Sequence, residues 1–171
     1  MTYLPQPAGF GSWLTGPPPR PRSVTFAVNF MYAGAALEAL GAIVTVARTS
    51  ALTTAIAVRQ GVTVSEAHGV AIHDTLVGVV GALIVASLWL WIARQNGAGR
   101  SWARILATVL FVLDTVLALL VLPMEHPGGV GAVLASLSWL VGLAAVICLW
   151  RRDASQYFNN VSQYLVRPRY L

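Results

Sequence analysis

Two carboxylic acids, Glu38 and Asp114, lie inside long apolar stretches, where an ionisable side chain is costly and marks a site of possible function. Each lies nine positions from the far end of its stretch, so we expect both at the same depth, about 13 Å at 1.5 Å per residue. A third acid, Asp74, lies near the boundary of another stretch. Glycine and alanine share the helix faces of these acids, which predicts that the acids point toward neighbouring helices.

No basic residue lies in the apolar stretches at the depth of Glu38 and Asp114. Both acids are therefore not expected to be charged together, because desolvation and like charge each disfavour ionisation. Three hypotheses stay open for this intramembrane acidic pair. The acids could be protonated and hydrogen-bond neighbouring helices, share a proton or bound cation as in a transporter or channel, or pair with an arginine of a partner subunit.

A second group of ionisable residues is expected on one side of the membrane, beyond the ends of the apolar stretches. Imidazole and carboxylate groups are suitable ligands for zinc or copper. The group lacks a recognised ligand spacing, however, and solvated loop residues are the other interpretation. The candidate ligands are His68, His73, His126 and Glu66.

The sequence contains none of the short motifs that indicate catalysis. There is no Gly-x-Ser-x-Gly, phosphate-binding loop, His-Glu-x-x-His or Cys-x-x-Cys motif. A single cysteine, Cys148, excludes an intrachain disulfide. We therefore predict no enzyme, no catalytic residue and no cofactor other than bound lipid.

Four apolar stretches must position the acids, and each is close to the ~20 residues that a helix needs to cross the hydrocarbon layer. In lipid every backbone polar group must be paired within the segment, which requires helices. A chain that is 57% hydrophobic and 10% charged leaves no room for a separate soluble domain. The sequence thus predicts an all-α polytopic membrane protein, a four-transmembrane-helix bundle over 24–150 with spans at about 24–47, 70–93, 103–122 and 130–150.

Arginines predict the orientation of this bundle. All eleven basic residues are arginines, and nine of them flank the first span's start, the second connection and the fourth span's end. Only Arg48 and Arg59 lie on the other side. By the positive-inside rule both termini are expected in the cytoplasm, in a multi-pass protein of the plasma membrane. This distribution explains the basic composition without nucleic acid as a partner.

Three segments outside the spans have their own patterns. Residues 1–23 form a proline-rich cytoplasmic tail, and residues 49–61 form an amphipathic external segment. Thr63 and Glu66 form a capping box, which predicts a helix from there to Arg94, about 45 Å long. We expect the proline-rich tail to dock onto the bundle or onto a partner through Phe10, Trp13 and Leu14.

Residues 151–171 are predicted to form a cytoplasmic amphipathic tail. Tyr157, Val161, Tyr164 and Leu165 recur at helical spacing and share one face. Flanking arginines favour a helix that lies against anionic lipid headgroups. The headgroup-binding residues are expected to be Arg151, Arg152, Arg167 and Arg169.

Three sequence segments resemble a group of small four-span membrane proteins of actinobacteria for which no activity is known. They are RPRSVTFAVNFMYAGAALEALG, GRSWARILATVLFVLDT and SWLVGLAAVICLWRRDASQYF, within about residues 20–158. GRSWAR and LWRR carry most of the resemblance, which implies a four-helix bundle in the plasma membrane and no particular site. The tail beyond Phe158 is longer than expected of that group and could add a contact surface.

These observations predict a non-enzymatic membrane protein that acts in assembly, as a homo-oligomer or as an accessory subunit of a larger membrane complex. Its expected partners are membrane lipids and a protein partner or a second copy of the chain. The alternative is a small proton- or cation-coupled transporter or channel that uses Glu38 and Asp114.

Overall fold

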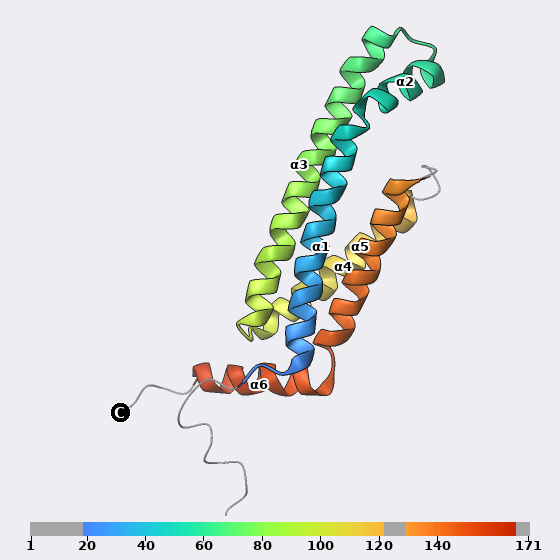
Figure 1. Cartoon of the computed structure of the whole chain (residues 1–171). Helices are drawn as coiled ribbons and strands as arrows, with labels where there is room; N and C mark the ends of the chain where they lie inside the picture. Colours follow the sequence, from blue (N-terminus) through green and yellow to red (C-terminus); the bar gives the residue numbers. More distant parts are fainter. Residues whose placement is uncertain (1–18, 122–128, 167–171) are drawn as a thin grey trace, which may run out of the picture.

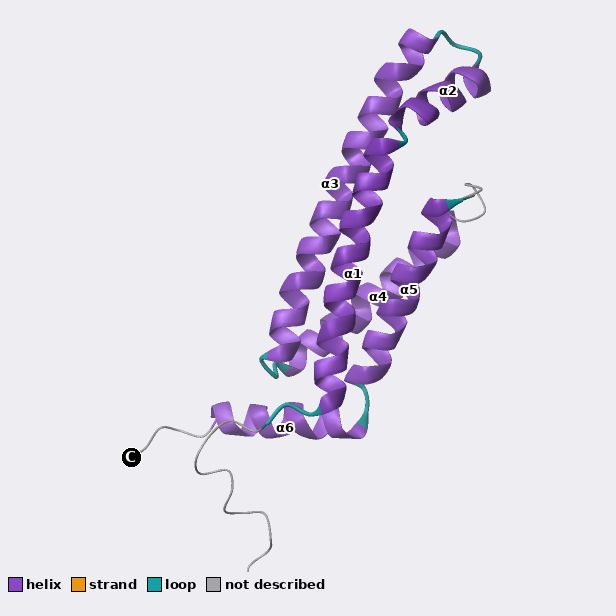
Figure 2. Ribbon diagram, viewed as in Figure 1, coloured by secondary structure: helices purple, strands orange, loops and turns teal. Residues whose placement is uncertain are grey.

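The computed structural model describes residues 19–121 and 129–166, with only the backbone described for 121 and 164–166. Within these residues every regular element is an α-helix (Figures 1 and 2). The helices are α1 (Arg22–Ala47), α2 (Thr49–Gln60), α3 (Val64–Gly97), α4 (Ser101–Val121), α5 (Val130–Leu149) and α6 (Arg152–Val166). By length and composition α1, α3, α4 and α5 can cross a membrane. The predicted all-α fold with four candidate spans is therefore confirmed.

Local sequence signals set the boundaries of α2 and α3. α2 ends at Gln60, and the next residue, Gly61, has a φ of 66°, a left-handed conformation that favours glycine. α3 begins after a capping box: the Thr63 hydroxyl accepts from the Glu66 N–H, while the Glu66 carboxylate accepts from the Thr63 N–H at 3.0 Å. The predicted capping box is thus confirmed. At 34 residues, α3 is about 50 Å long, so it exceeds the ~30 Å hydrocarbon layer.

α1 is the central helix of the bundle. It packs extensively on α3 and on α5, whereas α3 and α4 share few contacts. Small residues on α1 permit this close approach, since Ala27, Gly34, Ala35 and Ala42 are all buried. The arrangement is therefore a close α1–α3 pair and an α4–α5 hairpin that meets it on one side (Figure 1).

α6 crosses one end of the bundle, where α1 begins, α3 connects to α4 and α5 ends (Figures 1 and 2). We call this the α6 end and the opposite one the α2 end. The largest fully buried side chains gather at the α6 end, among them Phe158, Met31 and Leu149. The apolar surface along the spans is mostly exposed, as expected where lipid is the solvent.

A glycine turn fixes α6 against the α3–α4 connection. Gly99 has a φ of 75°, and a Cβ built there would lie 2.9 Å from a methyl group of Val161 on α6. Tyr157 reinforces the contact by donating from its hydroxyl to the Gly97 carbonyl at 3.5 Å. Only glycine fits this turn, both because of its backbone conformation and because α6 leaves no space for a side chain.

Candidate functional site: a seam between α3 and α4

Glu38 is the first of the predicted acids that the structure places. It lies half-buried on α1, and its Oε1 accepts a hydrogen bond of 2.9 Å from the Ser138 hydroxyl of α5. One turn nearer the α6 end, Trp89 of α3 contacts Gly34 of α1: a Cβ at Gly34 would lie 3.1 Å from its ring. Glu38 thus has an interhelical partner beside a closely packed part of the bundle.

Asp114 is placed differently, on a part of α4 that is not covered. It shares a helix face with Ala103, Ala107 and Leu110, at successive spacings of four, three and four residues. Ala103 and Ala107 are buried at the α6 end, and Leu110 packs against the core. Two turns beyond Ala107, the same face is exposed at Asp114. α4 has few contacts with the other helices, and it diverges from α3 with distance from the α6 end (Figure 1).

Two tryptophans, one within α5 and one at its end, hydrogen-bond to threonines of α4. Trp139 of α5 donates from its indole N–H to the Thr115 hydroxyl at 3.0 Å. Trp150 donates in the same way to the Thr108 hydroxyl at 2.9 Å. These two bonds join α4 to α5 at two levels, about two helical turns apart on α4.

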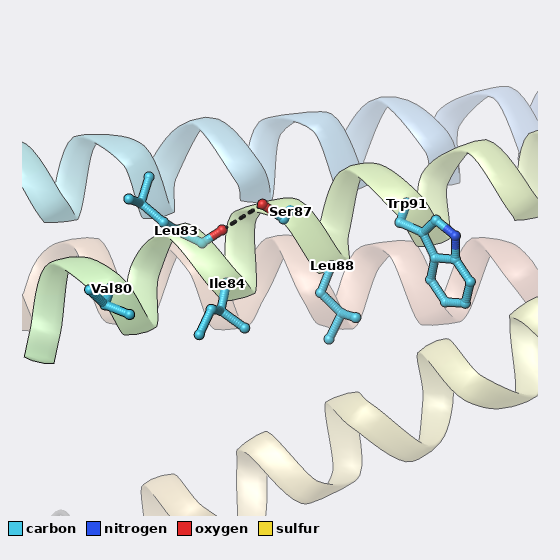
Figure 3. A pocket seen from close by; sticks show the side chains of 6 residues that line it. All are labelled: Val80, Leu83, Ile84, Ser87, Leu88 and Trp91. Carbon is cyan, nitrogen blue, oxygen red and sulfur yellow. Dashed lines mark hydrogen bonds between the residues drawn. The ribbon is translucent and has the colours of Figure 1, made fainter.

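α3 and α4 approach each other mainly at their connection. There the rings of Trp91 and Trp102 lie 5.4 Å apart. Beyond this contact a shallow apolar groove of about 650 Å³ follows α3. Ile84, Leu88 and Trp91 point to the side of α3 on which α4 lies, whereas Leu83 points away from it (Figure 3). We call this groove on α3, together with the exposed face of α4 that carries Asp114, the seam. Its α3 wall consists of Val80, Leu83, Ile84, Ser87, Leu88 and Trp91.

The structure does not bring the predicted acidic pair together. In the described residues Glu38 hydrogen-bonds to Ser138, and no hydrogen bond joins it to Asp114. Asp74, the third acid, is exposed on α3 and lies 3.3 Å from Nδ1 of the adjacent His73. The three acids therefore occupy separate environments, and of the three only Asp114 belongs to the seam as defined above.

The candidate metal ligands are also dispersed. Glu66 forms the cap of α3, while His68 and His73 are exposed on that helix. Among residues 19–121 and 129–166 no group of three or more histidine, cysteine or acidic side chains could hold a metal ion. His126 lies outside the described residues.

The predicted tail residues are described only in part. Arg151 and Arg152 are exposed at the start of α6, and Arg151 lies 3.9 Å from Asp153. Tyr157 and Val161 are buried on the predicted apolar face of α6. The other predicted docking and headgroup-binding residues, Phe10, Trp13, Leu14, Arg167 and Arg169, lie outside the described residues.

The threonine partners of the two tryptophans were missed by sequence reasoning. Threonine in an apolar helix usually bonds back to its own carbonyls, and Thr108 and Thr115 do so as well, to Arg104 and Phe111. Their second role as acceptors for indoles depends on how α4 and α5 are rotated. Trp139, which lies within the fourth span and away from its ends, was the available signal.

No protein-family model matches the chain, and no match was found among the curated proteins or the solved structures.

Proposed function

We propose that this protein is a non-enzymatic assembly subunit of the plasma membrane, and that the seam binds a transmembrane helix of another polypeptide. The observation that carries the proposal is the exposed carboxyl group of Asp114, on a face of α4 that is buried nearer the α6 end. A polar group on a helix face directed at lipid costs several kcal/mol less when another helix covers it and supplies a hydrogen-bond donor.

The two walls of the seam define the chemistry of the partner helix. The α3 wall is apolar apart from Ser87, whose hydroxyl donates to its own helix at the Leu83 carbonyl at 2.7 Å. The α4 wall supplies Asp114. A fitting helix therefore has an apolar face with one hydroxyl, amide or basic side chain, which would donate to the Asp114 carboxyl group. An interhelical hydrogen bond of this kind contributes about 1 kcal/mol in a membrane.

The distribution of arginines supports a cytoplasmic α6 end. The arginines around the start of α1, the α3–α4 connection and the start of α6 gather at this end (Figure 1). Arg48 and Arg59 belong to the α2 end. In this orientation α6 lies along the cytoplasmic membrane surface, where lipid headgroups are the expected ligands.

The proposal is tested by blocking the seam. Ala118→Trp adds bulk about one turn from Asp114 on the same face of α4, while Val116→Trp adds the same bulk on the opposite face. Both positions are exposed. Each variant is expressed in the native host, extracted in mild detergent, and measured for native mass and co-purifying membrane proteins.

We expect Ala118→Trp to reduce the assembly to the mass of one chain and Val116→Trp to leave it intact. An assembly composed of this chain alone would identify a homo-oligomer, and a second polypeptide would identify an accessory subunit. Loss of assembly in both variants, or in neither, would contradict binding at the seam.

A further inference from the structure

Arg104 occupies an unusual position at the α6 end. It lies in the first turn of α4, with its guanidinium carbon 4.8 Å from the centre of the Trp150 ring and 5.4 Å from that of Phe158. Its Nη1 donates to the Ser155 hydroxyl at 3.2 Å. Two aromatic rings and one hydrogen bond, from the end of α5 and from α6, therefore hold this cation in one orientation.

The charge of Arg104 is not balanced by the part of the chain that the structure describes. Among those residues no carboxylate lies within 4.0 Å of its guanidinium, and the acid in the first turn of α6, Asp153, lies beside Arg151 instead. Among the described residues, the Nε of Arg104 is buried without an acceptor, whereas its terminal Nη2 has no hydrogen-bond partner and is not buried. Further positive charge lies at the same end of the bundle, since Arg100 directly precedes α4, Arg151 directly precedes α6 and Arg152 is the first residue of α6.

We propose that Arg104 binds the phosphate of an anionic phospholipid headgroup. A guanidinium presents paired N–H donors that match the oxygens of a phosphate, and orientation by aromatic rings reduces the conformational entropy lost on binding. Arg104 lies where α6 crosses the end of the bundle (Figure 1), so a lipid with its acyl chains along the spans places its phosphate at this level. The lipid completes the charge balance that the chain leaves open.

This site is independent of the proposed function, because it uses a different end of α4 from Asp114 and needs no partner protein. It also differs from attraction between a basic tail and a membrane surface, which involves exposed arginines interchangeably. Arg100 provides the comparison: it is exposed, precedes α4 directly, and has no cation–π contact within the described chain.

The experiment measures lipid binding to the full chain in mild detergent by native mass spectrometry. The probes are phosphatidylglycerol and phosphatidylcholine of the same acyl composition. We expect Arg104→Gln to lower the affinity for phosphatidylglycerol about fivefold, with Arg100→Gln close to the wild type. Arg104→Lys, which keeps the charge but not the paired donors, is expected between the two. Equal losses in Arg104→Gln and Arg100→Gln, or unchanged binding in Arg104→Gln, would overturn the proposal.

A second measurement uses the wild-type chain and does not depend on the folding of any variant. Phenylglyoxal modifies accessible arginines, and the modified positions are mapped by mass spectrometry. We expect phosphatidylglycerol to slow modification of Arg104 more than that of Arg100, and phosphatidylcholine to have less effect. Equal protection by inorganic phosphate at the same concentration would identify a free anion and overturn the lipid assignment. If no probe protects Arg104 from modification, its role is only that of a structural contact between α4 and α6, and the lipid-binding proposal is overturned.

Discussion

The hydroxyl of Ser138 donates to the carboxyl group of Glu38 at 2.9 Å and joins α5 to the central helix α1. Glu38 thereby has a partner within the chain, while the carboxyl group of Asp114 is exposed on α4. Two acids that are similar in sequence context therefore differ in structure. Glu38 stabilises the chain's own helix packing, and Asp114 is left available for a second molecule.

The Ser138–Glu38 bond should be measurable in the stability of the bundle. Ser138→Ala removes the donor, and we expect a loss of about 1 kcal/mol in the free energy of unfolding. Ser87→Ala is the matched control, because the Ser87 hydroxyl bonds only to the Leu83 carbonyl of its own helix. Both variants are compared by unfolding in detergent micelles. An equal loss of unfolding free energy in the two variants would show that the interhelical bond stabilises the bundle no more than a hydroxyl bonded within its own helix.

Close packing at Gly142 gives a second stability prediction. A Cβ added to Gly142 of α5 would lie 3.0 Å from the Phe111 ring, whereas one added to Gly131 of the same helix meets no atom within 4 Å. We expect Gly142→Ala to cost about 1–3 kcal/mol through overpacking. Gly131→Ala should be neutral or slightly stabilising, because alanine favours helix more than glycine does. Thermal unfolding of both variants checks this, and a stable Gly142→Ala protein would contradict the packing.

Docking of α6 should depend on pH through Asp153. The pKa of this carboxyl group is lowered from its ordinary value of 3.8, first by a polar contact with the Ser23 hydroxyl and to a smaller extent by other groups, including Arg151. The contact is weaker than a well-formed hydrogen bond, because Ser23 Oγ has no partner that satisfies both distance and angle. A lowered pKa in the folded state means that ionised Asp153 stabilises folding above pH 3.8.

This stabilisation should disappear as the pH falls below 3.8 and through the lower pKa of the folded state. Release of α6 is measured by limited proteolysis with an acid-stable protease during a titration from about pH 6 to about pH 2. Asp153→Asn should remove this acid-dependent component, and Ser23→Ala should move it toward higher pH. A titration that is identical in wild type and Asp153→Asn would mean that Asp153 does not contribute.

The elements of the fold could be predicted from the sequence because each depends on local patterns. Apolar stretches of sufficient length predict the spans, and Thr63 with Glu66 predicts the start of α3. The spacing of Tyr157 and Val161 predicts the buried face of α6. These signals are set by helix periodicity and backbone hydrogen bonding, and neither requires knowledge of how the helices pack.

The candidate site could be predicted only in part, because it depends on how far α4 separates from α3. Small residues beside Asp114 predicted a face that other helices cover, and this holds at Ala103 and Ala107 but not at Asp114 itself. Helix periodicity gives the direction of a side chain and no information on the angle between two helices. Such angles depend on contacts between bulky side chains. Between α4 and α5, for example, the rings of Phe111 and Trp139 lie 5.7 Å apart.

The proposed orientation is tested by labelling single cysteines in intact cells. Cys148 is first replaced by serine, and Ser65→Cys and Ala98→Cys are added separately, since both positions are exposed at opposite ends of α3. With the α6 end in the cytoplasm, Ser65→Cys should react with an impermeant thiol reagent and Ala98→Cys should react only after permeabilisation. The reverse pattern would place the α6 end outside the cell.

Amide substitutions of the two acids separate assembly from transport. Asp114→Asn and Glu38→Gln keep size and hydrogen-bonding capacity but cannot release a proton. If the seam binds a partner by a hydrogen bond to protonated Asp114, Asp114→Asn should retain the assembly, whereas Asp114→Leu should weaken it by about 1 kcal/mol, or about fivefold in affinity. The assembly is measured by native mass in mild detergent.

Glu38→Gln is the matched amide variant, because the carbonyl oxygen of the new amide can still accept from the Ser138 hydroxyl within the bundle. A transporter would behave differently, since both amide variants would fold and yet abolish pH-dependent flux in proteoliposomes. An ionised Asp114 paired with a partner's basic side chain would give a third pattern. In that case Asp114→Asn would disrupt assembly as strongly as Asp114→Leu, while Glu38→Gln would leave it intact, because only Asp114 is exposed toward a second molecule.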